Sequence, residues 1–306
     1  MRITNQMMQR DASLRMQGNL RQVNTALQQA TTGLRLQRAS DDPAAASSAM
    51  QARGSLRALD QYRRNVQNAT SRLTQVESTL DQLTGTLTRA KELGLAQGGD
   101  TANAATRKIA AAEARQLLAH AVALGNTQFQ GEYLFGGLNT DPAGAAPFVA
   151  APTFLPADPT NPDFTANADP TGKRQAEIAT GQVFRGTADG KEVFLNSGAL
   201  KALYDLAEGL DQDDAPRIRT ALGALGSAFD HTQALLGEAG ASMNQLQVTS
   251  TNLDALEINL QTFKSDLEDA DFEKAVTELV SRQTAYQAAM MATSRVIGMT
   301  LTDYLR

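Results

Sequence analysis

Apolar residues near the N-terminus recur at alternating steps of three and four positions, on both sides of a break around Gly33. A repeat averaging 3.5 residues keeps one narrow stripe of a helix facing a partner helix, which is the geometry of a coiled coil. The first stripe comprises Met16, Leu20, Val23, Leu27, Ala30 and Leu34, and the second comprises Leu59, Tyr62, Val66, Ala69, Leu73, Val76, Leu80, Leu83, Leu87 and Ala90. The pattern therefore predicts two consecutive helices, each of which needs a partner.

The C-terminal part of the chain repeats this arrangement around a second break at Asp271. The stripe before it comprises Leu246, Thr249, Leu253, Leu256, Leu260, Phe263, Leu267 and Ala270, and the stripe after it comprises Leu279, Gln283, Tyr286, Met290, Thr293, Ile297 and Thr300, with Val276 and Leu301 beside it. We expect the outer stripes to pair with each other and the inner stripes to pair with each other, so that the two termini meet.

The first break carries residues that end one helix and begin the next. Gly33 suits the end of a helix, and Pro43 has its φ angle preset for the first turn of a new one. Ser40, Asp41 and Asp42 can accept hydrogen bonds from the unpaired amides of that starting helix. A helix is therefore predicted from Pro43 to about residue 95.

The middle of the chain has a different character. Seven of the nine prolines lie between residues 142 and 170, a density that long helices do not tolerate. Residues 188–191 are predicted to form a hairpin turn that joins Val183-Phe184 to Val193-Phe194. Helical patterns return from residue 197 onward.

These patterns predict a mainly α fold, in which paired N- and C-terminal segments form a long coiled-coil helical bundle with a small β-rich inserted domain. The expected domains are a terminal coiled coil (1–40 with 271–306), a helical rod (41–140 with 197–270) and the insertion (141–196). Two helices alone cannot bury both sides of their apolar stripes. The terminal domain is therefore expected to be disordered in the monomer and ordered among neighbours.

Composition narrows the classes of function. The chain of 306 residues has 28 basic and 33 acidic side chains, and this net charge of -5 argues against a general nucleic-acid binder. The absence of cysteine excludes disulfides and thiolate chemistry. The opening residues lack the apolar core of a secretory signal, and no apolar run is long enough for a membrane span. Residues 1–39 are rich in arginine, which leaves an organelle transit peptide as an alternative.

Candidate chemistry is sparse. His120 and His231 lie far apart and have no paired-ligand spacing. Asp211, Asp213 and Asp214 alternate loosely like a calcium loop, but the glycine and glutamate that an EF-hand requires are missing. We therefore expect no catalytic residue, no cofactor and no metal site, and the protein is not expected to be an enzyme.

Four stretches of the chain resemble the flagellin superfamily. They are Met1-Arg2-Ile3-Thr4 through Met7-Met8, then Thr32-Gly33-Leu34-Arg35 with Ser40-Asp41-Asp42-Pro43-Ala44, then Gly131-Glu132-Tyr133-Leu134-Phe135-Gly136-Gly137, and finally Asp271-Phe272 through Gln283-Thr284-Ala285-Tyr286-Gln287-Ala288 to Leu301-Thr302-Asp303-Tyr304-Leu305. The resemblance covers about residues 1–140 and 197–306, and residues 141–175 match no pattern of the superfamily.

The resemblance implies a structural protein of the bacterial flagellum that is secreted without a cleaved signal through the flagellar type III export apparatus. Pro43 and the Phe-Gly-Gly stretch favour a hook–filament junction protein, and flagellin itself is the alternative. A junction protein would form a homo-oligomeric ring with hook-associated protein 1 and flagellin as neighbours. An export chaperone would hold its C-terminal helices, and neither nucleic acid nor membrane insertion is implied.

Three sets of site residues follow from these arguments. The assembly helices are represented by Met16, Leu20, Val23, Leu27, Val276, Tyr286, Met290, Ile297, Leu301 and Tyr304. The rod core is represented by Leu59, Leu73, Val76, Leu80, Leu83, Leu253, Leu256, Leu260 and Phe263, with Leu73, Val76 and Leu80 expected against Leu253, Leu256 and Leu260. The family motif is Gly33, Arg35, Ser40, Asp41, Asp42 and Pro43.

Two other classes of protein stay open. A secreted enzyme with coiled-coil arms would need convergent catalytic side chains in residues 141–196, a segment without His, Cys or Trp. A cytoplasmic coiled-coil scaffold would stay in the cell, so the location of the protein separates it from a flagellar component.

Overall fold

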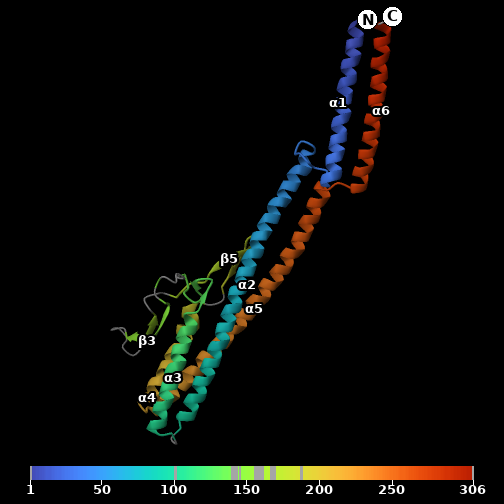
Figure 1. The fold of residues 1–306 in the computed structure, drawn as a ribbon. Helices are drawn as coiled ribbons and strands as arrows, with labels where there is room; N and C mark the ends of the chain where they lie inside the picture. Colours follow the sequence, from blue (N-terminus) through green and yellow to red (C-terminus); the bar gives the residue numbers. More distant parts are fainter. Residues whose placement is uncertain are drawn as a thin grey trace. The chain divides into compact units, whose positions relative to one another are not determined.

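The structure of the protein is a computed structural model. The structure describes residues 2–99, 102–138, 144, 146–154, 162–165, 170–186 and 189–304, with the backbone alone for residues 2–6, 8, 9, 154 and 295–304. The described chain is mainly α-helical, and its strands form short two-stranded antiparallel sheets (Figure 1). In this part of the chain, no helix combines the length and hydrophobicity that crossing a membrane requires.

The chain divides into two compact units. Unit 1 contains residues 1–59 and 255–306, and unit 2 contains residues 60–254. Two long helices, α2 (Pro43–Gln97) and α5 (Ala215–Glu268), contribute to both units. The mainly α fold built from paired N- and C-terminal segments is confirmed, whereas the three-domain division stays a proposal.

Unit 1 joins the two ends of the chain. Helix α1 (Arg2–Thr32) lies antiparallel to α6 (Phe272–Tyr304), and the two termini meet at the same end of this pair (Figure 1). The first turns of α2 and the last turns of α5 complete the unit. The outer helices therefore pair with each other, as their heptad stripes predict.

Helix α2 begins and ends where the sequence indicates. The Asp42 carboxylate accepts a hydrogen bond from the backbone N–H of Ala45 at 3.0 Å, and Pro43 is the first helical residue. The helix runs for 55 residues, and its buried heptad positions lie along one stripe. The predicted core members Leu59, Leu73, Val76, Leu80, Leu83 and Leu253 are all buried.

The axial register between α2 and α5 differs from the expected one. Within unit 2, the Arg63 guanidinium lies 3.5 Å from the Asp254 carboxylate, and the Thr74 hydroxyl contacts the Met243 sulfur at 3.9 Å. The predicted pairing of Leu73, Val76 and Leu80 with Leu253, Leu256 and Leu260 is therefore wrong. Heptad spacing looks the same after a slide of seven residues, so it cannot determine the level at which two helices meet.

Two predicted core positions on α5 are also wrong. Leu256 and Phe263 are both 48% exposed, whereas the next residues, Glu257 and Lys264, are partly buried. Long charged side chains can lay their aliphatic stems over an apolar contact while their heads reach water. The apolar stripe of α5 is thus wider than its contact with α2, and one edge of it stays exposed.

The insertion in unit 2 is built on a second helical pair. Helix α3 (Ala104–Gly125) packs against α4 (Ala199–Asp211), which buries Leu200, Leu203, Leu206 and Leu210. Phe194 contacts Phe135 and Phe148 at ring-centroid distances of 5.3 and 5.1 Å. These aromatic contacts anchor the strands to the helices.

The strands form three hairpin-like pairs. They are β1 (Gln128–Phe129) with β2 (Glu132–Tyr133), β3 (Phe148–Phe154) with β4 (Pro162–Thr165), and β5 (Gln175–Ala179) with β6 (Gln182–Arg185). Gly137 follows the first pair with φ of +63°, so close to the Thr171 carbonyl that any side chain would clash.

The predicted hairpin at residues 188–191 is wrong. Val183 and Phe184 pair with β5, and Val193 and Phe194 lie in a π-helix (Lys191–Asn196). Asp189 explains the difference, because its carboxylate accepts hydrogen bonds from the backbone N–H groups of Glu192 at 2.8 Å and Gly172 at 3.0 Å. A carboxylate that caps in this way starts a helical turn in place of a strand.

Candidate assembly surface and helix break

The break between α1 and α2 begins at Gly33, which has φ of +69°, a conformation that glycine adopts without strain. Its carbonyl accepts a hydrogen bond from the backbone N–H of Ala270 at 2.8 Å, in the break between α5 and α6. Leu34 and Asp269 form a β-bridge beside this bond. The two breaks, far apart in sequence, are therefore tied together backbone to backbone.

Arg35 strengthens this tie. Its backbone N–H donates to the Glu268 carbonyl at 2.7 Å, and its guanidinium donates to the Leu267 carbonyl at 2.8 Å. These two carbonyls belong to the last turn of α5, whose carbonyl groups lack partners inside the helix. Arg35 of the family motif thus caps the C-terminal end of α5.

The acidic residues of the motif have separate roles. Hydrogen bonding from the Ala45 backbone, with help from the nearby Arg35 guanidinium, lowers the pKa of Asp42 below its ordinary value of 3.8. The sequence predicts Asp41 as a cap of α2, but its carboxylate accepts a hydrogen bond from the Arg38 backbone N–H at 2.9 Å and closes the preceding turn. Ser40 lies exposed in that turn, and only Asp42 caps the helix.

A buried carboxylate lies next to the break and was not found from the sequence. Glu268 is 4% exposed, and its carboxylate accepts a hydrogen bond from the Arg53 guanidinium at 2.8 Å. This bond raises the pKa of Arg53, which therefore stays charged. The contact between Arg53 and Glu268 depends on the axial register of α2 against α5. The heptad pattern does not determine that register, so it does not predict this ion pair.

The contact between α1 and α6 follows a regular seam that the sequence predicted only in part. The less exposed positions form two heptad series: Ala12, Met16, Asn19, Val23, Ala26 and Ala30 on α1, and Ala275, Leu279, Tyr286, Ala289 and Thr293 on α6. Between Leu279 and Tyr286, the Arg282 guanidinium donates to the Gln22 side chain across the seam at 2.8 Å. Small residues at many of these positions let the helix axes approach closely.

Several predicted seam residues lie beside the seam instead, and three of them are large and apolar. Leu20 and Leu27 are 41% and 43% exposed and Met290 is 43% exposed, because Asn19, Ala26 and Ala289 occupy the seam. Val276, which follows the buried Ala275, lies at an equivalent position. Each of these four side chains is one residue past a seam position, which turns it by about 100° around its helix. Because α1 and α6 are antiparallel, this turn directs all four to the same side of the pair.

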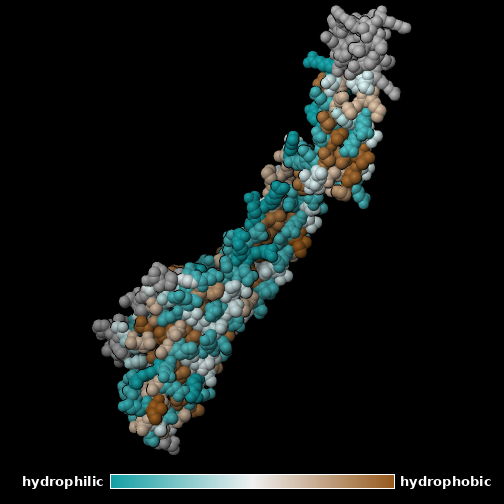
Figure 2. Space-filling view, viewed as in Figure 1, coloured by the Kyte–Doolittle hydropathy of each residue, from teal (hydrophilic) through white to brown (hydrophobic). Residues whose placement is uncertain are grey.

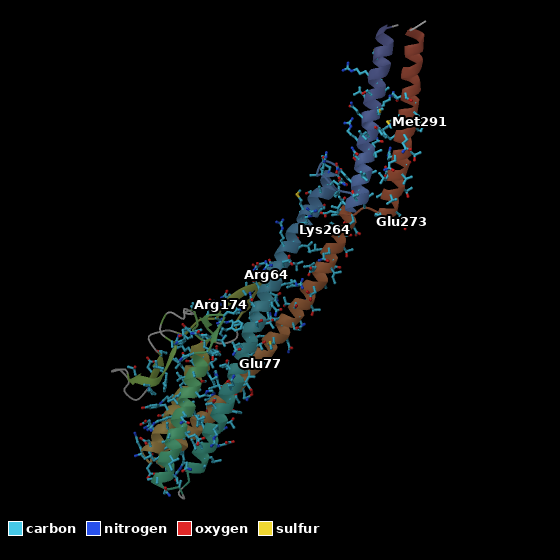
Figure 3. All side chains as sticks on the ribbon, viewed as in Figure 1. Arg64, Glu77, Arg174, Lys264, Glu273 and Met291 are labelled. Carbon is cyan, nitrogen blue, oxygen red and sulfur yellow. The ribbon has the colours of Figure 1, made fainter. Side chains whose placement is uncertain are left out.

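We call Leu20, Leu27, Val276 and Met290 the apolar flank. Further large hydrophobic side chains are exposed on the same two helices: Met7, Leu14, Phe272, Val280 and Met291. Figure 2 shows hydrophobic surface gathered on the α1–α6 pair, and Met291 is labelled on α6 in Figure 3. The side chains of the predicted assembly residues Ile297, Leu301 and Tyr304 lie outside the described residues. Exposed apolar surface of this extent is typical of protein–protein contact sites, so the α1–α6 pair is the candidate assembly surface.

The acidic residues of the α4–α5 connection are used structurally. Asp211 pairs with Arg115 at 2.9 Å, Asp213 pairs with the buried Arg107, and Asp214 caps α5 through the Arg217 backbone N–H. In the part of the chain that the structure describes, no group of His, Asp and Glu side chains is arranged to hold a metal ion.

Comparison with known proteins gives a consistent family. Residues 3–140 match the bacterial flagellin N-terminal helical region, and residues 222–305 match the bacterial flagellin C-terminal helical region. Among individual proteins, the chain is 24% identical to the flagellar filament 33 kDa core protein of Treponema phagedenis, over 93% of this chain and 92% of that protein. It is 25% identical to a flagellin of Halalkalibacterium halodurans, over 90% of this chain and 88% of that protein.

Solved structures share the fold. FlgL of Bacillus cereus is 24% identical with a TM-score of 0.57, covering 70% of this chain and 99% of that one. The flagellar hook-associated protein 3 of Legionella pneumophila is 15% identical with a TM-score of 0.59, covering 71% of this chain and 98% of that one. The two matched family regions include the paired terminal helices and the break that ties them together, and they span most of the sequence, so this chain belongs to the flagellin family.

Proposed function

We propose that this flagellar structural protein is the hook–filament junction protein, which forms a homo-oligomeric ring between hook-associated protein 1 and the first flagellin subunits. The observation that carries the proposal is the apolar flank on the α1–α6 pair, since a surface of this kind is buried only in an assembly. The fold shared with FlgL and hook-associated protein 3 supports the junction as the place of that assembly.

The physical role of the flank is to join neighbouring subunits. Moving a large apolar side chain from water into a packed contact contributes about 1.5–3 kcal/mol when it is fully exposed beforehand. The flank residues are roughly half exposed, so each subunit gains part of that energy at every contact. The ends of the chain are then ordered by their neighbours, and the terminal pair contributes little to the stability of the monomer.

The same helix also suits a chaperone. Before export, α6 would present its apolar residues to a groove that accepts an amphipathic helix. Export through the flagellar type III apparatus would release the chaperone, and the residues would then be buried against adjacent subunits outside the cell.

Flagellin is the second candidate, because curated flagellins align with about nine tenths of this chain. Deletion of the gene separates the two. Loss of a junction protein leaves hooks without filaments and flagellin free in the medium, whereas loss of the flagellin leaves no flagellin in the medium. The protein should also be detected in sheared flagella in amounts far below those of the filament subunit, and an abundance equal to that of the filament subunit would favour flagellin.

A double variant tests the C-terminal helix directly. Ile297→Asp with Leu301→Asp places charges in the expected subunit contact, at little cost to the free monomer. We expect unchanged melting of the monomer, weaker chaperone binding, and flagellin released into the medium. Normal filaments on cells that carry this variant would contradict the assignment.

A further inference from the structure

A cleft of about 340 Å³ opens in unit 2 between α2 and the β1–β2 and β5–β6 hairpins. Leu73, Val76, Leu134 and Phe184 give it an apolar lining, and all four are buried. Its volume is at the lower end of the range of about 300–1,000 Å³ found for ligand pockets. The cleft therefore has room for one aromatic side chain together with a polar group.

Two guanidinium groups line this cleft and converge on one carboxylate oxygen. The Glu132 Oε2 atom lies 2.6 Å from the Arg174 guanidinium and 3.9 Å from that of Arg72, which also donates to the Leu134 carbonyl at 2.9 Å. The other acidic side chain of the lining, Asp189, accepts hydrogen bonds from two backbone N–H groups. The cleft thus offers more cationic donors than its own carboxylates can satisfy.

The electrostatics of Arg72 agree with this excess. Burial, and then the nearby charge of Arg174, lower the pKa of Arg72, while Glu132 raises it. A charged group in this situation gains from a second anion. An incoming carboxylate at the rim would stabilise both arginines.

The occupant must therefore combine an apolar side chain with an acid. Among the exposed large hydrophobic residues that the structure describes, Phe272 is the only one with acidic residues on both sides in sequence, Asp271 and Glu273. Phe272 is 64% exposed in the first turn of α6. Asp271 caps that helix through the Lys274 backbone N–H, whereas the Glu273 carboxylate has no ion pair within the described residues.

We propose that Phe272 of one copy of this chain inserts into the cleft of a second copy, where Glu273 pairs with Arg174. Both Glu273 and Arg174 are labelled in Figure 3. Because the inserted residue and the cleft are different surfaces, the contact is head to tail, and repetition of it gives a closed ring or a helical row. The ring rests on the proposed function, whereas the contact between two copies does not depend on it.

Cysteine pairs test this contact, because the natural chain contains no cysteine. One protein carries Thr277→Cys, one helical turn from Glu273 on α6, and the other carries Asn68→Cys in the lining of the cleft. Mixed and oxidised, they should form a disulfide-linked heterodimer. Met291→Cys, farther along α6, replaces Thr277→Cys in the control pair. A heterodimer yield no higher than that of the control pair would overturn the proposal.

Variants of the aromatic residue show whether the side chain itself matters. Phe272→Ala in the Thr277→Cys protein should lower the heterodimer yield about tenfold, as expected for an aromatic residue central to a contact. Phe263→Ala is the matched control, because Phe263 is also an exposed aromatic residue of unit 1, and it should leave the yield unchanged. An unchanged yield with Phe272→Ala would overturn the insertion.

Charge reversal tests the pairing. Arg174→Glu in the cleft protein should reduce the yield roughly fivefold, and Glu273→Arg in the partner should restore it. Arg64→Glu, at an exposed position of α2 outside the cleft lining, should have little effect. Equal losses for Arg174→Glu and Arg64→Glu, without restoration, would overturn the Glu273–Arg174 pairing.

A crosslinking experiment in cells distinguishes the contact between two copies from the proposed location in the flagellum. The two cysteine variants are produced together, and sheared flagella are oxidised and analysed for heterodimers. Variants that are present in the flagella without a heterodimer overturn the contact but leave the location intact. Variants that are absent from the flagella overturn the location, and the experiment in solution then decides the contact by itself.

Discussion

Arg53 and Glu268 form an ion pair at 2.8 Å in which the carboxylate is almost fully buried and the guanidinium is about half exposed. It joins α2 to the last turn of α5, at the residue whose backbone carbonyl accepts the hydrogen bond from Arg35. Glu268 thus stabilises unit 1 in two ways. Its side chain ties α5 to α2, and its backbone carbonyl ties α5 to the break between α1 and α2.

Arg53→Ala should destabilise unit 1, because it leaves the Glu268 carboxylate buried without a partner. The exposed side of the pair reduces the effect, so we expect about 1–3 kcal/mol in the free energy of unfolding. Chemical denaturation measures it, with Arg64→Ala as an exposed control that should change stability by less than about 0.5 kcal/mol. Equal effects of the two variants would show that the pair contributes nothing.

Leu80→Ala should lower the free energy of unfolding by about 2–5 kcal/mol, since the side chain is 1% exposed in the core of unit 2. Leu256→Ala removes the same atoms from a position that is 48% exposed, so its cost in the monomer should be far smaller. Thermal melting of both variants checks the assignment. A large loss of stability in Leu256→Ala would show that Leu256 is a core residue, as the heptad pattern predicts.

The seam between α1 and α6 can be tested with one small residue. Ala26 is 4% exposed, so the larger side chain of Ala26→Leu would force the helices apart and weaken their pairing. Leu20→Ala, on the apolar flank, should leave the pairing intact. A cysteine introduced at residue 22 and another at residue 282, where the two side chains already meet, would report the pairing through disulfide formation.

Helix caps should make unit 1 sensitive to acid. Backbone hydrogen bonds lower the pKa values of Asp42 and Asp271 below 3.8. A lowered pKa means that the carboxylates contribute stability above the unfolded-state value and lose it as the pH falls through the folded-state value. Helix content should therefore fall below about pH 4. Asn caps without titrating, so Asp42→Asn with Asp271→Asn should reduce this acid-dependent step, as followed by circular dichroism.

Hydrogen exchange should distinguish the ends of the monomer from its core. We expect residues 50–90 to be protected and residues 1–35 and 272–306 to exchange rapidly, because an isolated helix pair with an exposed apolar flank opens easily. Protection of both ends in a sample verified to be monomeric would contradict the expectation that neighbours order them.

Local chemistry in the sequence predicted the elements well. Pro43 and Asp42 marked the start of α2 because a cap involves residues only a few positions apart. The heptad repeat predicted which helices pair, since it reports the width and period of an apolar stripe. It could not choose between Asn19 and Leu20 for the seam, because the stripe was wider than the contact and both phases keep the same period.

Long-range details needed the folded chain. The level at which Asp254 meets Arg63 depends on the connections at the end of unit 2, which heptad spacing does not contain. The π-helix after Asp189 replaces a predicted strand because the Asp189 carboxylate bonds to the nearby amide of Glu192 and to the more distant amide of Gly172. The two arginines of the cleft are far apart in sequence. Arg72 lies on α2 and Arg174 immediately precedes β5, so no local sequence pattern brings them together.

The hydrogen bond between Ala270 and Gly33 also has a consequence for the order of folding. It closes a loop that includes most of the chain, and α1 leaves the ribosome long before the residues of α6 exist. Closing such a loop carries an entropic cost that local helix formation does not. Unit 1 is therefore the last part of the protein that can form, and α1 stays without its partner helix until synthesis of α6 is complete.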